Sequence, residues 1–424
     1  MSKQQSLWLG GVICFFATLF YVYDYFVQVA PSVMVSDLMR DFQIDAQSLG
    51  ILSACFFYSY AIMQIPAGWM LDHFGARKIL SLAVLVSAIG VIVFSQAKGL
   101  WVAGLGRFLV GIGSAFSFIS TLYLISRWFS HKYFATLAGF VQLGGCVGSM
   151  IGLAPIAVVV NNYGWRFSML VTGEVTLILA VLFFWLIQNG PQKRATETHK
   201  TSFSEVKNIL VNKQVLMVCV CGLLCWVPVG GVGALWGVPY MMKAYHIDNT
   251  TAGEYIAWFW LGVGLGSPLV GWLSHYLSRR RIPMLLCFCA ALVASLLLIE
   301  AAYLPLIVCI FALFLLGFSA SIQSLTFGIM KDLVPEKQFG FMSGVLNMAA
   351  IIGGGIAQPL IGFILNFSWQ GHYANGIPLY TLKNYQYSLY LLPAIALIGV
   401  WLTTFLLKET YCAKHLHTKA VCKV

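Results

Sequence analysis

Long apolar stretches alternate with short polar segments along all 424 residues of the chain. Twelve of the stretches approach the roughly 20 residues that an α-helix needs to cross a bilayer. They lie at 7–33, 46–71, 79–97, 101–126, 134–160, 167–188, 214–242, 252–275, 282–303, 305–330, 339–365 and 386–407. The first stretch runs past signal-peptide length without a small-residue cleavage site, so we expect it to be retained. The pattern predicts an all-α membrane protein with twelve transmembrane helices.

Two polar turns between apolar stretches have similar sequences and lie half a chain apart. The first occupies 68–78 and the second 271–281, an offset of 203 residues. Gly139 and Gly344 repeat at nearly the same spacing, 205 residues. A recurring offset of this size indicates a duplicated six-helix unit. We expect an N-terminal bundle at 1–188, a cytoplasmic linker at 189–213, a C-terminal bundle at 214–407 and a cytoplasmic tail at 408–424.

Composition supports the membrane assignment. The chain is 60% hydrophobic and 9% charged, with a mean hydropathy of +0.84, values that exclude an ordinary soluble domain. The net charge of +11 is distributed unevenly: of 25 Lys and Arg, 19 fall on the side of the N-terminus and five on the other. Basic residues gather in cytoplasmic loops, which predicts both termini in the cytoplasm of an inner (plasma) membrane protein and no nucleic-acid binding.

The cysteines do not predict a disulfide framework or a metal centre. Most of the eleven lie within apolar stretches, where they behave as small core residues. The C-terminal tail holds Cys412, His415, His417 and Cys422, but their spacing matches no standard zinc site. No nucleophile or metal cluster lies at membrane depth, so we expect no enzyme activity, no metal and no cofactor.

Asp24 and Arg107 are charges inside predicted spans, where a charge is costly and usually faces a cavity or a partner. Counting from the helix ends places the two at depths that agree within a turn, so an ion pair between them is geometrically feasible. Tyr21 and Gln28 are one turn from Asp24 on the same helix face. The alternative is a purely structural ion pair. Glu174, in the sixth span, is a second carboxylate within an apolar stretch, and both a structural or interfacial role and proton carriage are open for it.

Polar and aromatic residues in the second half complete the candidate substrate site. The seventh span is interrupted by glycine and proline, a pattern typical of substrate sites near repeat boundaries. It carries Trp236 and Tyr240, while the tenth and eleventh spans carry Gln323 and Asn347. Together with Asp24 and Arg107 these side chains suit a small zwitterion bound near mid-membrane between the halves.

The turn at 68–78 resembles the loop motif G-x-L-x-D-R-x-G-x-R-K of the major facilitator superfamily, with Asp72, Gly75, Arg77 and Lys78 at its positions and His73 in place of the usual Arg. The run that begins at Arg107 resembles the family's helix-4 motif R-x-x-x-G-x-G. This resemblance implies two pseudo-symmetric six-helix bundles and transport by alternating access. It also implies gating by the loop motif and a role for the helix-4 Arg in proton coupling or substrate binding.

Finer similarities point in two directions. The segments 60–66 and 235–240 look like the phagosomal amino-acid and nucleoside transporters of intracellular bacteria. The region around Asp24 is similar to anion:cation symporters, which often follow that Asp with Arg, whereas Tyr25 follows it here. We therefore predict a monomeric, proton-coupled importer of an amino acid or, next, a nucleoside, with Asp24 as proton carrier and Arg107 as its partner. The alternative is an exporter or importer of an organic anion, siderophore or drug.

A sensor or channel is the other class of function to weigh. Neither needs a duplicated six-helix unit with a charged gating turn, so the sequence favours transport over both.

Overall fold

The computed structural model describes residues 3–190, 209, 211–374 and 376–411. Within these residues twelve helical spans are long and apolar enough to cross a membrane. They are Trp8–Val33, Ala46–Phe74, Ala76–Gln96, Leu100–Trp128, Lys132–Tyr163, Trp165–Leu186, Lys213–Tyr245, Asn249–Tyr276, Arg281–Ile299, Leu306–Leu333, Gln338–Phe367 and Leu382–Leu406. The twelve predicted spans are confirmed, and the protein is a multi-pass membrane protein. Most of the predicted linker, and the part of the tail that holds its Cys and His residues, lie outside the described residues.

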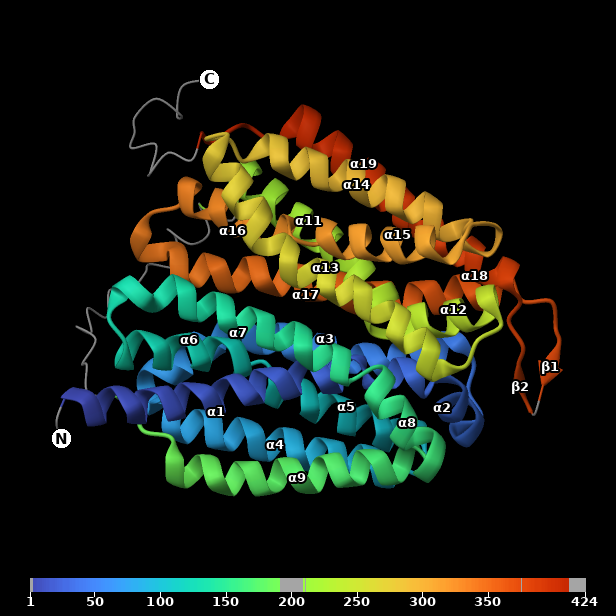
Figure 1. The fold of residues 1–424 in the computed structure, drawn as a ribbon, viewed down its shortest axis with the longest axis horizontal. Helices are drawn as coiled ribbons and strands as arrows, with labels where there is room; N and C mark the ends of the chain where they lie inside the picture. Colours follow the sequence, from blue (N-terminus) through green and yellow to red (C-terminus); the bar gives the residue numbers. More distant parts are fainter. Residues whose placement is uncertain (1–2, 191–208, 210, 375, 412–424) are drawn as a thin grey trace.

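The first six spans form one side of the molecule (Figure 1). Their elements are α1 (Lys3–Val29), η1 (Ala30–Val33), α2 (Val35–Phe42), α3 (Ala46–Phe74), α4 (Ala76–Gln96), α5 (Leu100–Ser114), α6 (Ser117–Trp128), α7 (His131–Ile151), α8 (Ala154–Tyr163) and α9 (Trp165–Leu186).

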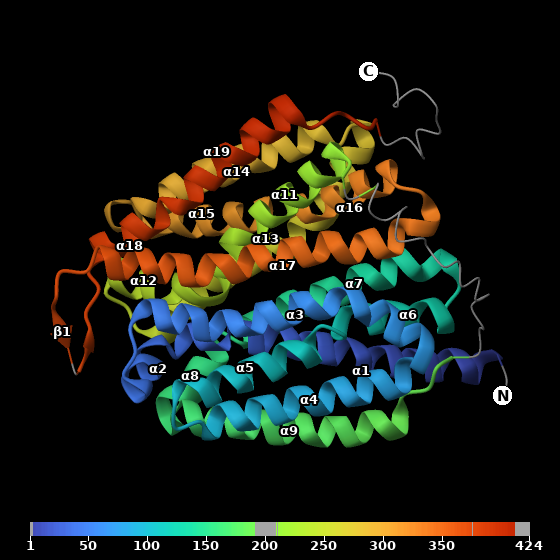
Figure 2. The same ribbon diagram turned by 180° about the vertical axis from the view of Figure 1, so that it is seen from behind.

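The last six spans form the other side. Their elements are α11 (Lys213–Pro228), η2 (Val229–Trp236), α12 (Gly237–Tyr245), α13 (Asn249–Tyr276), α14 (Arg281–Ile299), η3 (Ala301–Tyr303), α15 (Leu306–Ser319), α16 (Ile322–Leu333), α17 (Glu336–Phe367), β1 (Tyr373–Ala374), β2 (Ile377–Pro378), α18 (Leu382–Leu389), α19 (Leu391–Trp401) and η4 (Leu402–Leu406). The two strands pair antiparallel in a small hairpin that projects beyond the helices (Figures 1 and 2).

The duplication seen in the sequence is present in the fold. The fourth span breaks at 115–116 between α5 and α6, and the tenth breaks at 320–321 between α15 and α16, which repeats the offset of Gly139 and Gly344. α3 begins at Ala46 and α13 at Asn249, which repeats the offset of the two polar turns. We call the end of the molecule that holds the turns after α3 and α13 the basic end, and the opposite end, with α2 and the β-hairpin, the hairpin end.

The halves meet along α3 and α17, which lie side by side in both views (Figures 1 and 2). Glycines allow their backbones to approach closely. A Cβ on Gly50 of α3 would lie 2.5 Å from the Gln358 carbonyl oxygen, and one on Gly362 of α17 would lie 2.3 Å from the Ala46 carbonyl oxygen. In a bilayer no hydrophobic driving force brings helices together, so close van der Waals packing between small residues stabilises such contacts.

The seventh span shows why a glycine- and proline-rich sequence breaks a helix. After Pro228 the chain continues as the π-helical segment η2 before α12 resumes the α-helix. Gly230 packs against Gly354 of α17 so closely that a Cβ would lie 2.3 Å from its Cα. The predicted interruption is therefore confirmed, and it serves a backbone contact within the second half.

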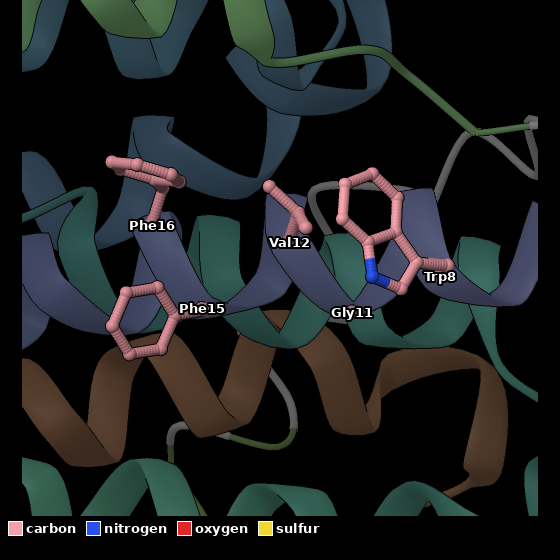
Figure 3. A pocket seen from close by; sticks show the side chains of 5 residues that line it. All are labelled: Trp8, Gly11, Val12, Phe15 and Phe16. Atoms are coloured by element: carbon pink, nitrogen blue, oxygen red, sulfur yellow. The ribbon is translucent and has the colours of Figure 1, made fainter.

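Large apolar side chains cover the outside of the bundle, as expected of a surface that faces lipid. At the start of α1, Trp8, Gly11, Val12, Phe15 and Phe16 line a shallow depression (Figure 3). The Trp8 and Phe15 side chains are 73% and 64% exposed, and all five residues belong to one helix. An apolar dent of this kind has no polar group with which to orient a substrate, so the candidate site is sought between the helices.

Candidate functional site

Asp24 lies inside the first half, 1% exposed, on α1. One carboxylate oxygen, Oδ2, accepts a hydrogen bond from the Ser117 hydroxyl at 2.7 Å. The other, Oδ1, has no partner among the described residues. Ser117 reaches Asp24 because the fourth span breaks beside it, where the Phe116 amide bonds to Gly113, three residues back. A buried carboxylate with one unsatisfied oxygen is a high-energy arrangement that a proton, a water or a ligand relieves.

Arg107 is also buried, 3% exposed, on α5. Its Nη1 donates to the Val27 carbonyl of α1 at 2.8 Å, and its guanidinium carbon lies 5.0 Å from the centre of the Phe56 ring of α3. The remaining donors, Nε and Nη2, have no partner within the described part of the chain. The guanidinium is thus held in place by a carbonyl and an aromatic face, with donors left for an anion.

The ion pair that we considered between Asp24 and Arg107 is not formed in this structure. The carboxylate turns to Ser117 and the guanidinium to Val27, and no ion pair joins the two. Equal depth in the membrane therefore did not bring the charges together, because each side chain points toward a different neighbour. Their roles as proton carrier and partner remain predictions.

Tyr21 and Gln28 share the helix with Asp24 but have different surroundings. The Tyr21 hydroxyl bonds to Gln142 of α7 at 3.1 Å and to the Tyr25 hydroxyl at 3.3 Å. Tyr25 in turn packs edge-on against Trp260 of α13, with ring centroids 5.6 Å apart. Gln28 is 3% exposed, and its Nε2 has no partner among the described residues. The tyrosines thus lie where the two halves meet.

Gln323 and Asn347, predicted to bind substrate, belong to a chain of amides that crosses between the halves. Gln323 Nε2 of α16 lies 3.5 Å from Asn347 Oδ1 of α17. Asn347 Nδ2 donates to Gln64 Oε1 of α3 at 2.7 Å. Gln64 Nε2 in turn lies 3.5 Å from the Ala115 carbonyl at the break of the fourth span. The two predicted residues are brought together, and Gln64 is the first-half residue that they contact.

Trp236 and Tyr240 make their side-chain hydrogen bonds elsewhere. Both side chains are 1% exposed. Trp236 Nε1 donates to the Gln358 carbonyl of α17 at 2.9 Å, and the Tyr240 hydroxyl donates to the Leu298 carbonyl of α14. These bonds satisfy the polar atoms of both rings inside the second half. The structure therefore gives no support for the substrate contact that we expected of them between the halves, which remains a prediction.

The predicted gating residues lie at the basic end. Gly75 ends α3 with a φ of +78°, a conformation that favours glycine. Arg77 donates from Nε to the Phe184 carbonyl of α9 at 3.0 Å and lies over the Phe184 ring. Asp72 and Lys78 are exposed, and Asp72 has no ion pair among the described residues. Arg77 is thus engaged within its own half, and the gating role of all four residues remains a prediction. Glu174 is exposed on α9.

Sequence reasoning missed two residues of this region. Ser117 escaped notice because a lone serine in an apolar stretch carries no motif. Gln142 was hidden among the glycines of the fifth span. Only the packing of α6 and α7 against α1 shows that these groups meet Asp24 and Tyr21.

Comparison with known proteins decides the family. The model of the Major Facilitator Superfamily matches residues 14–238 and 229–419. The chain belongs to this superfamily. Two solved structures of a bacterial homologue of the human lysosomal transporter Spinster, both inward-facing, superpose with TM-scores of 0.74 and 0.75 over 93% of this chain and 96% of theirs. At 16% identity they confirm the fold alone, which agrees with the predicted class.

The curated relatives match over most of their length but are distant. An uncharacterized transporter, YybO, of Bacillus subtilis is 24% identical over 81% of this chain and 85% of its own. The probable galactarate/D-glucarate transporter GudP of the same organism is 23% identical over 81% and 83%. The membrane sensor protein UhpC of Salmonella typhimurium is 23% identical over 87% and 86%. Most of these relatives are named as transporters, as we predicted, and one is named as a sensor.

Proposed function

We propose that this protein imports a small organic anion across the plasma membrane, with both termini and the basic end in the cytoplasm, and that protons drive the uptake. The observation that carries the proposal is Arg107. Its buried guanidinium leaves Nε and Nη2 without a partner in the described part of the chain. A carboxylate or sulfonate oxygen is the natural acceptor for two such donors, since charge-assisted bonds to guanidinium are among the strongest in proteins.

The relatives favour the same substrate class over the amino acid that we first predicted. Besides GudP, the matched proteins include a probable sulfoacetate transporter of Cupriavidus necator, 28% identical over 44% of this chain, and a D-galactonate transporter of Escherichia coli, 23% identical over 78%. The sequence argument for an amino acid also used Trp236 and Tyr240 as contacts for its side chain, and both rings are bonded inside the second half. An organic anion, first held as the alternative, is therefore the better supported substrate.

Asp24 is the proposed proton carrier. It is a carboxylate buried inside a span, with Oδ1 unbonded within the described residues. Its separation from Arg107 lets the protein bind a proton and an anion at different groups, so that loading one does not remove the site of the other. A carrier protonated outside and deprotonated inside couples the proton gradient to accumulation.

The test uses purified protein in liposomes with an inward proton gradient. We expect accumulation of galactarate, D-glucarate, D-galactonate or sulfoacetate, and none of amino acids or nucleosides. Asp24→Asn should abolish gradient-driven accumulation but keep counterflow exchange, because the anion site remains. Arg107→Gln should impair both accumulation and exchange. Losing one charge-assisted contact should weaken the apparent affinity for the anion by about tenfold or more. Arg40→Gln removes the same charge from an exposed position and serves as the control.

Each alternative gives a different result. Uptake of amino acids alone would contradict the organic-anion proposal, and pH-driven accumulation by Asp24→Asn would remove that residue as carrier. A sensor, the second candidate because of the similarity to UhpC, would bind an anion in a thermal-shift assay that depends on Arg107 and show no uptake.

A further inference from the structure

The two halves are bonded to each other at the hairpin end along two seams. Seam A joins the start of α3 to the end of α17, and seam B joins the end of α8 to the start of α13. Each seam pairs a helix of one half with a helix of the other. A transporter that opens its hairpin end must break both seams.

Seam A is a closed circuit of hydrogen bonds. Asp45 accepts from the Ser48 amide at 2.8 Å as the N-cap of α3 and, through Oδ2, from Asn366 Nδ2 of α17 at 2.7 Å. The Tyr380 hydroxyl, in the segment that follows the β-hairpin, donates to Asn366 Oδ1 at 2.5 Å and accepts from the Ala46 amide at 3.1 Å. Tyr380 is 4% exposed. One carboxylate thus stabilises the start of a helix and also holds the opposite half.

Seam B has a similar plan, but its bonds join neutral amides and lie nearer to solvent. Asp248 is the N-cap of α13 and accepts from the Thr251 amide at 3.3 Å. The next residue, Asn249, accepts from Asn161 Nδ2 of α8 at 2.8 Å. Its own Nδ2 donates to Asn161 Oδ1 at 3.1 Å and to the Val33 carbonyl of η1 at 3.0 Å. Asn161 is exposed, so water competes for its bond.

The duplication relates the two seams residue by residue. Asp45 and Asp248 repeat at the offset of the two polar turns, and Asn161 and Asn366 repeat at the offset of Gly139 and Gly344. Each seam therefore has a capping aspartate on one helix and an asparagine on the facing helix. The partner differs: Asn366 bonds to the capping aspartate itself, whereas Asn161 bonds to the residue after it.

The close backbone contacts beside these hydrogen bonds are also repeated in the two halves. Gly50 and Gly253 are counterparts in the two halves, at the same offset as the capping aspartates. A Cβ on Gly50 would lie 2.7 Å from Pro359 Cα of α17, and one on Gly253 would lie 2.9 Å from the nitrogen of Ala154 of α8, the counterpart of Pro359. At each seam the glycine lets the facing helices come close enough for the side-chain bonds above it.

The structure assigns these residues as a duplicated gate: Asp45, Asn366 and Tyr380 latch seam A, Asn161 and Asn249 latch seam B, and the latches hold the hairpin end closed. The bonds of seam A include a carboxylate and a buried phenol, so seam A is the stronger latch. The assignment rests on alternating access and on the proposed orientation, with the hairpin end outside; it does not depend on the substrate or on the proton carrier proposed above.

The test measures how readily the hairpin end opens without substrate. Ser32, on η1 beside seam B, is 2% exposed and lines a groove of about 350 Å³ between the halves with Asn161 and Asn249. A Ser32→Cys reporter in intact cells is treated with a membrane-impermeant maleimide. Modification of the peptide that contains residue 32 is followed by mass spectrometry, so the native cysteines do not interfere.

Labelling should accelerate in the order of latch strength. In Asn366→Asp a second carboxylate faces Asp45, and we expect the fastest labelling, about tenfold above the parent. Tyr380→Phe removes two bonds and should give about fivefold, and Asn161→Ala should give less. The controls are Tyr385→Phe, a buried tyrosine in α18, and Asn162→Ala, whose amide bonds within α8 at the Val158 carbonyl.

Unchanged labelling in Asn366→Asp and Tyr380→Phe, or equal acceleration in Tyr385→Phe, overturns the assignment. If Asn366→Asp does not reach the membrane, Tyr380→Phe and Asn161→Ala decide the question alone. A failed uptake assay with the expected labelling pattern rejects the proposed substrate and leaves the gate standing.

Discussion

The basic end shows how two copies of one loop have come to differ. In the first half the Arg77 amide, at the start of α4, bonds to Asn189 Oδ1 at 2.9 Å. In the second half the amides of Arg280 and Arg281, at the start of α14, bond to the two carboxylate oxygens of Glu409 at 2.8 and 3.1 Å. In both halves the third span, α4 or α14, is capped by a residue from the segment that follows the sixth span of that half.

Charge distinguishes the copies. In the second half Arg280 forms an ion pair with Asp332 of α16 at 3.2 Å, the two side chains being 12% and 6% exposed, and Thr410 donates to the same carboxylate at 2.7 Å. In the first half Asp72 is exposed and has no ion pair within the described residues. The second loop uses its charges to hold its own half together, whereas the carboxylate of the first loop is exposed and unpaired within the described residues. His275, which occupies the place of Asp72 in the second copy, cannot supply that negative charge.

The largest effect that would test this contrast is expected from Arg280→Met. It leaves Asp332 buried beside Thr410 without a countercharge, which costs about 3 kcal/mol. The melting temperature of the purified protein should fall by several degrees. Arg279→Met, the same change at the exposed neighbouring residue, should leave it unchanged. The double variant Arg280→Met with Asp332→Leu should recover much of the loss. Equal destabilisation by Arg280→Met and Arg279→Met would contradict a stabilising role of the ion pair between Arg280 and Asp332.

An intermediate effect is expected when the caps are exchanged. Glu409→Gln removes the charge that faces the positive end of the α14 dipole and should cost about 1 kcal/mol. Asn189→Asp gives the first half the carboxylate of the second and should gain a few tenths of a kcal/mol, because Arg77 stands beside it. Melting temperatures at low and at high salt measure both, and the gain should shrink as salt rises. A loss from Asn189→Asp would mean that the two caps are not equivalent.

The smallest effect on stability, and the most informative about gating, is expected from Asp72→Asn. Asp72 has no ion pair in the described part of this structure. The melting temperature of the variant should therefore stay within about 1 °C of the parent, as is usual for surface substitutions. If Asp72 closes the basic end in another state, accessibility of thiols on that side should nevertheless rise during transport. An unchanged labelling rate together with unchanged uptake would assign Asp72 to an ordinary exposed turn.

The architecture could be predicted without coordinates. Span length, apolar content and the two repeated offsets lead to twelve helices in two related sets, because a bilayer leaves a backbone few ways to satisfy its polar groups. The loop motif at Asp72 and Arg77 and the helix-4 run at Arg107 identified the superfamily. Asp24 and Arg107 were found as buried charges because any charge in hydrocarbon stands out in an apolar sequence.

Which of these groups meet depends on the packing of the helices. The depth of a residue in the membrane can be read from the sequence. The neighbouring helix that its side chain faces cannot, because it depends on how the helices pack. Asp24 therefore faces Ser117 and Arg107 faces Val27, although their depths agree. For the same reason Trp236 and Tyr240 turn into the second half, and Gln64 meets Asn347 across the halves.

The circuit of Asp45, Asn366 and Tyr380 is likewise not predictable from the sequence, because Asp45 is more than 300 positions from the other two in the chain. It joins the start of the second span to the end of the eleventh and to the segment after the β-hairpin. An aspartate before a helix predicts an N-cap, because its carboxylate can accept from the first free amides. Nothing local predicts that the same carboxylate also holds an asparagine of the other half, since that contact exists only once the two bundles have packed together.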